Sequence, residues 1–382
     1  MAETPYLEVF GHEEVRTRLT RAVERGLLPQ SLLLYGPRGV GKQRLALWIA
    51  AALNCSNGPP RPCGGCRSCR LVGRLEHPDV HWFFPMTRPK GSTSPDRLER
   101  VLEDQRAEAL EERRADPLYV EETAGVTGIY VAVVGVMRKL AHKAPAMGPL
   151  KVLIVGHAEA LTPQLGSAEA ANALLKLLEE PPEDTTLILT SDMPGALLPT
   201  VRSRVQAIRI TPLPLDRVAQ FLSEHTELSV KEARQVAEAS GGCIGRALEL
   251  SDESHERVRG EALNLVRALL DGRPTARFAA AHSQRSFGAR GDFGRILEEA
   301  RGLLRDLLAA SAGAEGSVLR REVTRSLIGR YGPEPGHLVR ALEALERAGA
   351  LAERNVNPQL IVVRLLHDGG AKAATGPSRE VR

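Results

Sequence analysis

Short apolar runs alternate with helical patterns over the first half of the chain. The runs SLLLY at 31–35, VLIV at 152–155 and TLILT at 186–190 have the length and composition of buried parallel strands. HWFF at 81–84 is typical of a further core strand, and the alanine- and leucine-rich residues 45–53 form a helical pattern after the first run. Strands that alternate with helices along a chain predict an α/β domain built on a parallel sheet.

The pattern changes to helix alone after Pro212. Apolar positions recur there at helical spacing, and no convincing strand run follows. We therefore predict an α/β domain over residues 1–211, a small helical domain over 212–252 and a longer all-α domain over 253–367. The small and polar residues 368–382 are expected to be disordered. The predicted helices include 214–225, 230–239, 243–250, 261–270, 293–308 and 335–348.

Residues 88–123 interrupt this rhythm. They begin with RPKGSTSP and continue as LERVLEDQRAEALEERRADP, a highly charged stretch with few large apolar residues. Charge runs of this kind usually lie in solvent. We expect an inserted loop followed by an exposed helix, which is either a solvated feature or a contact for a partner.

Length and composition support several folded domains. At about 150 residues per domain, the 382 residues correspond to roughly two or three domains. The 51 basic and 47 acidic residues nearly cancel and aromatic residues make up 4%, so we do not expect a protein that coats polyanions or stacks single-stranded DNA. The first residues lack a secretory signal, and no apolar run approaches the ~18 residues of a membrane helix. A cytoplasmic protein without membrane contact is expected.

A candidate phosphate-binding loop follows the first strand. GPRGVGK at 36–42 matches the first seven positions of the P-loop motif, with a strand before it and a helix after it. Glycines let the backbone N–H groups point inward, and the helix N-terminus adds partial positive charge. A plain glycine-rich turn is the alternative. The candidate nucleotide-binding residues are Gly36, Pro37, Arg38, Gly39, Val40, Gly41, Lys42 and Gln43.

The motif lacks the groups that organise magnesium. Its eighth position normally carries a Ser or Thr hydroxyl that binds the metal, but here it is Gln43. A second device would be an acid at the end of an apolar strand, yet strand 152–155 ends in Gly156 and His157, and Glu159 is expected to face along a helix. Hydrolysis should be very slow or nil unless other residues hold the metal. Binding of ATP or ADP is expected to be weak or absent.

Four of the five cysteines lie close together, with the spacing C-x7-C-x2-C-x2-C. In a chain without export signals this pattern predicts reduced thiolates that bind a metal. Four thiolates without an open position predict a structural zinc ion, and an iron–sulfur cluster is the alternative because ligand type alone does not separate the two. Cys243 is expected to be a plain buried thiol. The predicted metal ligands, within 55–69, are Cys55, Cys63, Cys66 and Cys69.

Taken together, these motifs resemble the bacterial DNA polymerase III clamp-loader subunits, the gamma/tau and delta-prime proteins of the AAA+ class. The resemblance spans most of the chain and includes the phosphate loop, the cysteine knuckle, NALLKLLEEPP at 172–182, LPTVRSR at 198–204, GCIGRAL at 242–248 and NVNPQL at 355–360. The gamma/tau subunits keep the magnesium-binding groups, whereas delta-prime subunits commonly lose them. With Gln43, Gly156 and His157, the chain is more similar to delta-prime.

The resemblance implies roles for two arginines. Arg204 matches the arginine of the family's SRC phrase, which reaches the ATP phosphates of a neighbouring subunit as a finger in trans; the third letter here is Val205. Arg246 matches the family's second sensor, which touches nucleotide in cis. An ordinary surface arginine is the alternative for Arg204. Without the metal-binding groups, the role of Arg246 stays open.

The resemblance also implies a non-hydrolysing stator, a non-catalytic subunit of the DNA polymerase III holoenzyme, which is a DNA-directed DNA polymerase complex. Its partners would be the gamma/tau and delta subunits, the sliding clamp indirectly, and primed DNA through the complex, in the nucleoid-associated cytoplasm. Residues 1–211 would form the AAA+ domain with the zinc knuckle, 212–252 the lid and 253–367 the collar. The alternatives are an active gamma/tau-type ATPase and a zinc-stabilised nucleotide-binding switch.

Overall fold

A computed structural model describes residues 5–89, 94–118, 127–161, 168–251, 253–271, 273, 275, 279, 292–318, 320–353 and 356–370. The chain forms two compact units. The first contains the described parts of 1–121, 127–237 and 242–248; the second contains 238–241 and the described residues from 249 on. Residues 371–382 of the expected tail, Asn355, and the parts 90–93 and 119–123 of the insert lie outside the described residues.

The first unit is built on a parallel sheet of five strands in the order β2–β5–β6–β1–β7. Every residue of β5 and β6 is buried, because helices cover both faces of the sheet, as continuous apolar runs require. The expected strands at 31–35, 81–84, 152–155 and 186–190 are all present. The strands of this sheet are β1 (Ser31–Tyr35), β2 (Val80–Phe83), β5 (Lys151–Val155), β6 (Thr185–Ser191) and β7 (Gln206–Arg209).

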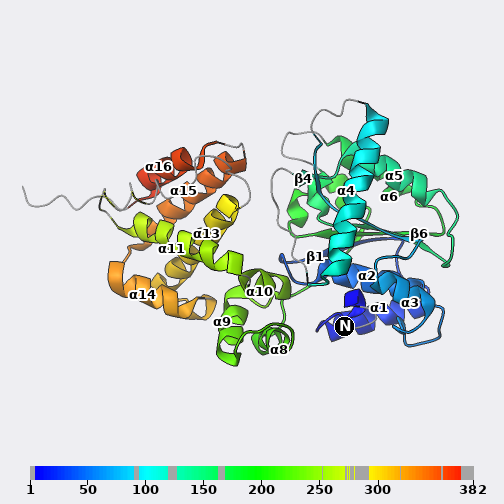
Figure 1. The fold of residues 1–382 in the computed structure, drawn as a ribbon, viewed down its shortest axis with the longest axis horizontal. Coiled ribbons are helices and arrows are strands. Elements are labelled where there is room, and N and C mark those ends of the chain that lie inside the picture. The colour runs from blue at the N-terminus through cyan, green and yellow to red at the C-terminus, as the bar shows by residue number, and fades with distance from the viewer. Residues whose placement is uncertain are drawn as a thin grey trace, which may run out of the picture. The chain divides into compact units, whose positions relative to one another are not determined.

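Helices flank this sheet, with α1, α2 and α3 on one side and α5 and α6 on the other (Figure 1). A separate antiparallel pair joins β3 (Met86–Thr87) to β4 (Thr127–Gly128). The α-helices are α1 (Glu13–Glu24), α2 (Lys42–Leu53), α3 (Arg67–Gly73), α4 (Pro95–Ala115), α5 (Val131–Ala141), α6 (Glu169–Glu179), α7 (Pro199–Arg202), α8 (Leu215–His225), α9 (Val230–Ser240) and α10 (Ile244–Ser251). Short 3-10 turns are η1 (Pro5–Leu7), η2 (Ala158–Leu161) and η3 (Pro194–Ala196).

The charged insert forms α4, and the expectation that this helix is simply exposed is wrong. Leu102 is fully buried on the face that packs against the domain. The guanidinium of Arg113 is buried 4.0 Å above the ring of Phe84, and that of Arg106 lies 5.0 Å above the ring of Phe83. Arginine stems and guanidinium planes cover aromatic surface as apolar side chains do, so the helix packs without a long apolar stripe.

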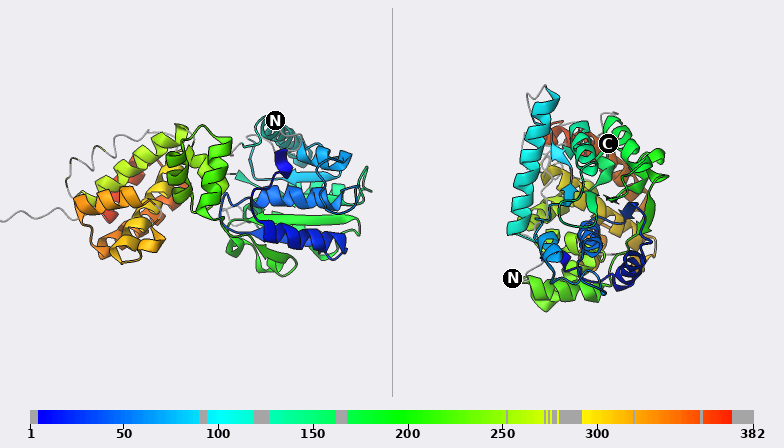
Figure 2. Two further views of the ribbon diagram at one scale, coloured as in Figure 1. Left: turned by 90° about the horizontal axis from the view of Figure 1, so that it is seen from below. Right: turned by 90° about the vertical axis from the view of Figure 1, so that its right-hand side faces the viewer.

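The second unit consists of helices alone among its described residues, packed around a core of leucine, alanine, isoleucine and valine (Figure 2). Its elements are α11 (Glu253–Leu270), α13 (Asp292–Ser311), η4 (Glu315–Ser317), α14 (Arg321–Tyr331), α15 (Pro335–Glu353) and α16 (Pro358–Gly369). A buried ion cluster joins α13 to the residue that precedes α14: Arg320 donates to Glu299 at 2.9 Å and to Asp306 at 3.1 Å. In the described part of the chain, no helix combines the length and the apolar character needed to span a membrane.

Candidate functional site

The candidate site lies where the parallel strands of the first unit end. The phosphate loop, residues 36–42, leaves β1 and leads into α2, and β6 and β5 end beside it. Gly36 N–H donates to the carbonyl of Ser191 at 3.2 Å, which ties the start of the loop to the end of β6. Carboxyl ends of parallel strands commonly form ligand sites, because the connecting loops and helix N-termini converge there. The placement of the loop therefore agrees with the sequence prediction.

The ammonium group of Lys42 is enclosed by acceptors from the protein. Its Nζ donates to the carbonyls of Gly36 at 2.9 Å and Pro37 at 2.7 Å, and it forms an ion pair of 2.5 Å with Asp192 Oδ1. The side chain of Lys42 is only 4% exposed. Two carbonyl oxygens and one carboxylate oxygen therefore surround the ammonium group.

Asp192 is the site residue that the sequence argument missed. It follows the last residue of β6, and β6 pairs with β1, which carries the phosphate loop. The two residues of the ion pair with Lys42 are far apart in sequence, and only the pairing of the strands brings them together. One feature of the sequence does point to Asp192: it is a carboxylate directly after a buried strand, and carboxyl ends of parallel strands lie at the same sheet edge as the loop.

His157 and Glu159 join Asp192 beside the loop. His157 Nδ1 lies 3.4 Å from Asp192 Oδ2 and 3.7 Å from Glu159 Oε1, and Asp192 N–H donates to Glu159 Oε1 at 3.3 Å. The expectation that Glu159 faces along a helix is therefore wrong, because η2 turns its carboxylate back toward the end of β6. His157 adopts a φ of 50°, in the left-handed region that non-glycine residues rarely occupy.

The charges in this cluster shift one another's pKa values. Burial lowers the pKa of His157, but hydrogen bonds and charges from Asp192 and Glu159 outweigh it and raise the pKa to about 9. Burial raises the pKa of Asp192, but His157 and Lys42 bring it down to about 2. The pKa of Glu159 is lowered, because its bond to His157 opposes the effect of burial. At neutral pH the cluster therefore contains two cations and two anions.

The donor atoms of His157, Glu159 and Asp192 lie within 4.8 Å of one another, close enough to be tested as a cation site. The contacts argue against that use. A cation would share the Asp192 carboxylate with the Lys42 ammonium, which already lies 2.5 Å away. His157 is also unsuited to bind a cation. Its pKa is raised to about 9, so the imidazole is protonated at neutral pH, and only a neutral imidazole ligates a metal.

The side chain of Gln43 lies beside Gly156, the position directly after β5 where the acid of a magnesium site is expected. A Cβ atom at Gly156, directly after β5, would lie 3.0 Å from Gln43 Nε2 and 3.2 Å from Trp82 Nε1. The carboxamide of Gln43 and the bare backbone of Gly156 thus fit each other. The two departures from the P-loop pattern are neighbours in space, although they are far apart in sequence.

The phosphate loop also contacts the start of α10. Gly245 N–H donates to the carbonyl of Gly39 at 2.8 Å. Gly39 has a φ of 76°, and a Cβ atom there would lie 2.5 Å from the backbone nitrogen of Arg246. Glycine is therefore required at position 39 both by conformation and by space. The backbone nitrogen of Arg246, the candidate sensor, therefore lies beside the loop.

Arg204 lies near the surface, with its side chain 34% exposed. It donates to the carbonyl of Thr200 at 2.9 Å, and it forms an ion pair of 2.7 Å with Glu179, the last residue of α6. Glu179 belongs to the NALLKLLEEPP phrase and Arg204 to the LPTVRSR phrase. The structure thus brings two of the sequence motifs together. An ion pair this exposed stabilises a fold only weakly, so the guanidinium is available for exchange with another anion.

The four clustered cysteines converge on one point. Their sulfur atoms lie within 4.8 Å of one another, and the pairs Cys63–Cys69 and Cys55–Cys66 are each separated by 4.0 Å. A zinc ion bound at about 2.3 Å by four sulfurs requires sulfur separations close to this value. Backbone N–H groups of Cys66 and Cys69 donate to the sulfurs of Cys63 and Cys66, at 3.3 and 3.4 Å, which favours thiolates. The donor set therefore fits a structural zinc ion.

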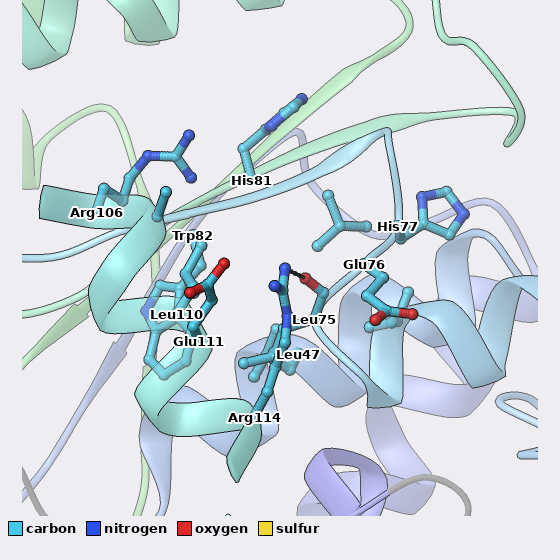
Figure 3. Close-up of a pocket in the computed structure, with 13 residues that line it drawn as sticks. Leu47, Leu75, Glu76, His77, His81, Trp82, Arg106, Leu110, Glu111 and Arg114 are labelled. Atoms are coloured by element: carbon cyan, nitrogen blue, oxygen red, sulfur yellow. Dashed lines mark hydrogen bonds between the residues drawn. The ribbon is translucent and has the colours of Figure 1, made fainter. Parts of the chain in front are cut away.

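A cavity of about 280 Å³ lies under α4, between that helix, α3 and β2 (Figure 3). Its wall combines apolar side chains such as Leu47 and Leu110 with polar groups at the rim, and Arg114 donates across it to the carbonyl of Leu75 at 2.8 Å. No phosphate-loop residue lines it. The cavity belongs to the packing of the insert and is separate from the candidate nucleotide site.

The proteins that this chain resembles include subunits of DNA polymerase III. A family model described as DNA polymerase III, delta subunit, matches residues 11–214. The DNA polymerase III subunit delta' of Bacillus subtilis is 29% identical to this chain; the match covers 66% of this chain and 63% of the relative. The subunit delta' of Pseudomonas aeruginosa is 32% identical; that match covers 62% of this chain and 60% of the relative. The subunit tau of Escherichia coli is 27% identical over 65% of this chain and 33% of its own length. The chain thus spans about six tenths of the delta' relatives.

Among solved structures, a gamma subunit-related protein of DNA polymerase III from Thermotoga maritima is similar. It is 18% identical, has a TM-score of 0.40, and the match covers 92% of this chain and 97% of that one.

Proposed function

The chain belongs to the family of DNA polymerase III delta subunits, within the clamp-loader delta-prime and gamma group, and from this premise we propose that it is a non-hydrolysing delta-prime subunit. It would act as a stator beside gamma/tau and delta subunits, which use ATP to load the sliding clamp on primed DNA. The observation that carries the proposal is the contact between Gln43 and Gly156, where a magnesium site would place a hydroxyl and a carboxylate.

Several contacts support the loss of hydrolysis. Phosphoryl transfer requires a metal that bridges phosphate oxygens and a group that positions water. The acidic side chain beside the loop lysine, Asp192, contacts Lys42 and His157 rather than being open to a metal. The loop keeps its glycines and its N–H groups, so weak binding of ATP or ADP without catalysis is compatible with the site.

Arg204 is proposed as the group that this subunit contributes to a neighbour. Its guanidinium is partly exposed, and its partner Glu179 is also near the surface. A phosphate group carries more charge than one carboxylate and accepts bidentate hydrogen bonds from guanidinium, so ATP of an adjacent subunit would compete well for Arg204. The AAA+ arrangement proposed for residues 1–211, the lid 212–252 and the collar 253–367 would present this surface at a subunit boundary.

A structural zinc ion is proposed at Cys55, Cys63, Cys66 and Cys69. Four thiolates close the coordination shell, so the ion would stabilise the knuckle, which ends in the first turn of α3, and take no part in phosphate chemistry. Zinc at this site would couple folding of residues 55–69 to metal binding.

An active ATPase of the gamma/tau type is the second candidate. It is favoured by the similarity to tau and by the intact loop of residues 36–42. The two candidates differ in where ATP is cleaved: in this chain or only in its neighbours.

Reconstitution with gamma/tau and delta subunits tests the proposal. We expect clamp loading to require this chain, and Arg204→Ala to lower the ATPase of the complex about tenfold or more while assembly is retained. Arg202→Ala, on the neighbouring exposed position, is the matched control and should change little. ATPase activity that is equal in the Arg204 and Arg202 variants would remove the trans role, and clamp loading without this chain would remove the assignment.

A further inference from the structure

The phosphate loop of this chain already contains an anion of its own. Asp192 Oδ1 lies 2.5 Å from Lys42 Nζ, so a carboxylate pairs with the ammonium group that a P-loop lysine normally offers to a nucleotide phosphate. The other two acceptors of Lys42 are carbonyls of the loop, from Gly36 and Pro37. All of these groups belong to the first unit; Lys42 is buried, and the side chain of Asp192 is 16% exposed.

Asp192 is itself fixed from the opposite side. His157 Nδ1 faces its second oxygen at 3.4 Å, and Glu159 accepts from its backbone N–H. His157 keeps a left-handed backbone conformation in this arrangement. Such strain persists when surrounding contacts fix the residue; here the two carboxylates face the ring of His157, and its backbone N–H donates to Thr190 Oγ1 at 3.2 Å. Lys42, Asp192, His157 and Glu159 thus form a closed network with balanced charge.

We propose that Asp192 is an internal substitute for a nucleotide phosphate, which stabilises the phosphate loop and competes with nucleotide for Lys42. The inference deepens the proposed function, on which it rests, because it names the group in the same site that opposes nucleotide binding. A phosphate that enters the loop must displace the carboxylate of Asp192 and leave it beside a second anion. The loop therefore favours the nucleotide-free state although its glycines are intact.

The test is binding of a fluorescent ADP to the purified chain in EDTA, comparing wild type with Asp192→Asn. The amide keeps the shape and an acceptor for Lys42 but removes the competing charge, so we expect binding at least about tenfold tighter. Glu159→Gln is the matched control: it removes one charge from the same cluster without touching Lys42, and we expect less than about a threefold change. Unchanged or weaker binding by Asp192→Asn, or an equal gain in Glu159→Gln, would overturn the proposal.

A second measurement does not depend on nucleotide. Urea unfolding of Lys42→Met should show a lower midpoint, because the variant leaves the largely buried carboxylate of Asp192, 16% exposed, without its ammonium partner. In the Asp192→Asn background the same substitution should lower the midpoint by less than half as much. Equal shifts in both backgrounds would contradict the pairing. Both assays use the isolated chain, so they can fail while clamp loading by the reconstituted complex succeeds, and the reverse also holds.

Discussion

Gly156→Ala tests whether the site has been rebuilt around a missing side chain. The added Cβ would lie 3.0 Å from Gln43 Nε2 and 3.2 Å from Trp82 Nε1, both tighter than ordinary contact. Overpacking of this kind destabilises by about 1–3 kcal/mol. Replacing glycine restricts the unfolded chain and offsets about 0.4–1 kcal/mol of that. We therefore expect a net loss of about 1 kcal/mol in the free energy of unfolding.

A double-mutant cycle, measured by urea unfolding, tests whether the side chain of Gln43 causes this loss of stability. Gln43→Ala removes the closest atom, so Gly156→Ala should be nearly neutral in that background, with a coupling energy of about 1 kcal/mol. Gly135→Ala is the matched control, because no atom lies within 4 Å of the added methyl in the interior of α5; we expect it to stabilise by about 0.5–1 kcal/mol. If Gly156→Ala behaves like Gly135→Ala in both backgrounds, the fit between Gln43 and Gly156 is refuted.

Three further outcomes are expected. Cys66→Ser should abolish zinc in elemental analysis and lower the melting temperature by about 10 °C, whereas Cys243→Ser should keep the zinc. The pKa of His157 is about 9 in the folded chain and 6.5 in the unfolded chain. The charged imidazole therefore stabilises the folded chain fully below pH 6.5, and this contribution is lost as the pH rises through 9. The difference in unfolding free energy between wild type and His157→Gln should shrink over that range. Arg320→Met should destabilise the second unit by about 3–5 kcal/mol, and Arg305→Met, at an exposed position, by less than about 0.5 kcal/mol.

Each of these three predictions can be contradicted by a specific result. Zinc retained by the Cys66 variant contradicts the four-sulfur site. A stability difference for His157→Gln that is constant between pH 5 and 10 contradicts the raised pKa. Equal effects of the two arginine variants contradict the role of the buried ion cluster.

Much of the fold could be predicted because its signals are local. Runs such as 31–35 and 152–155 are apolar throughout, as strands buried on both faces must be, and both are strands. β7 was not predicted because it lies at the sheet edge, where most of its residues are exposed and no apolar run marks it. α4 was predicted as a helix, but its packing uses Arg113 and Arg106 on aromatic rings, and charge patterning does not reveal such contacts.

The candidate site divides in the same way. The phosphate loop and the cysteine cluster are contiguous in sequence, so spacing alone locates them. Asp192 and Glu159 approach Lys42 and His157 only because β1, β5 and β6 pair in one register, and the sequence does not show that register. Reading the end of each strand for polar residues would have found Asp192 as a candidate, but not its ion pair with Lys42.

Magnesium-dependent ATP turnover by the purified chain tests most directly whether this pocket has lost hydrolysis. The Lys42→Ala variant provides the baseline, because it removes the ammonium group of the P-loop lysine. We predict that wild type and Lys42→Ala give the same turnover at every magnesium concentration. Turnover of ~1 per second or more that Lys42→Ala abolishes would show a working catalytic site and contradict the proposed stator.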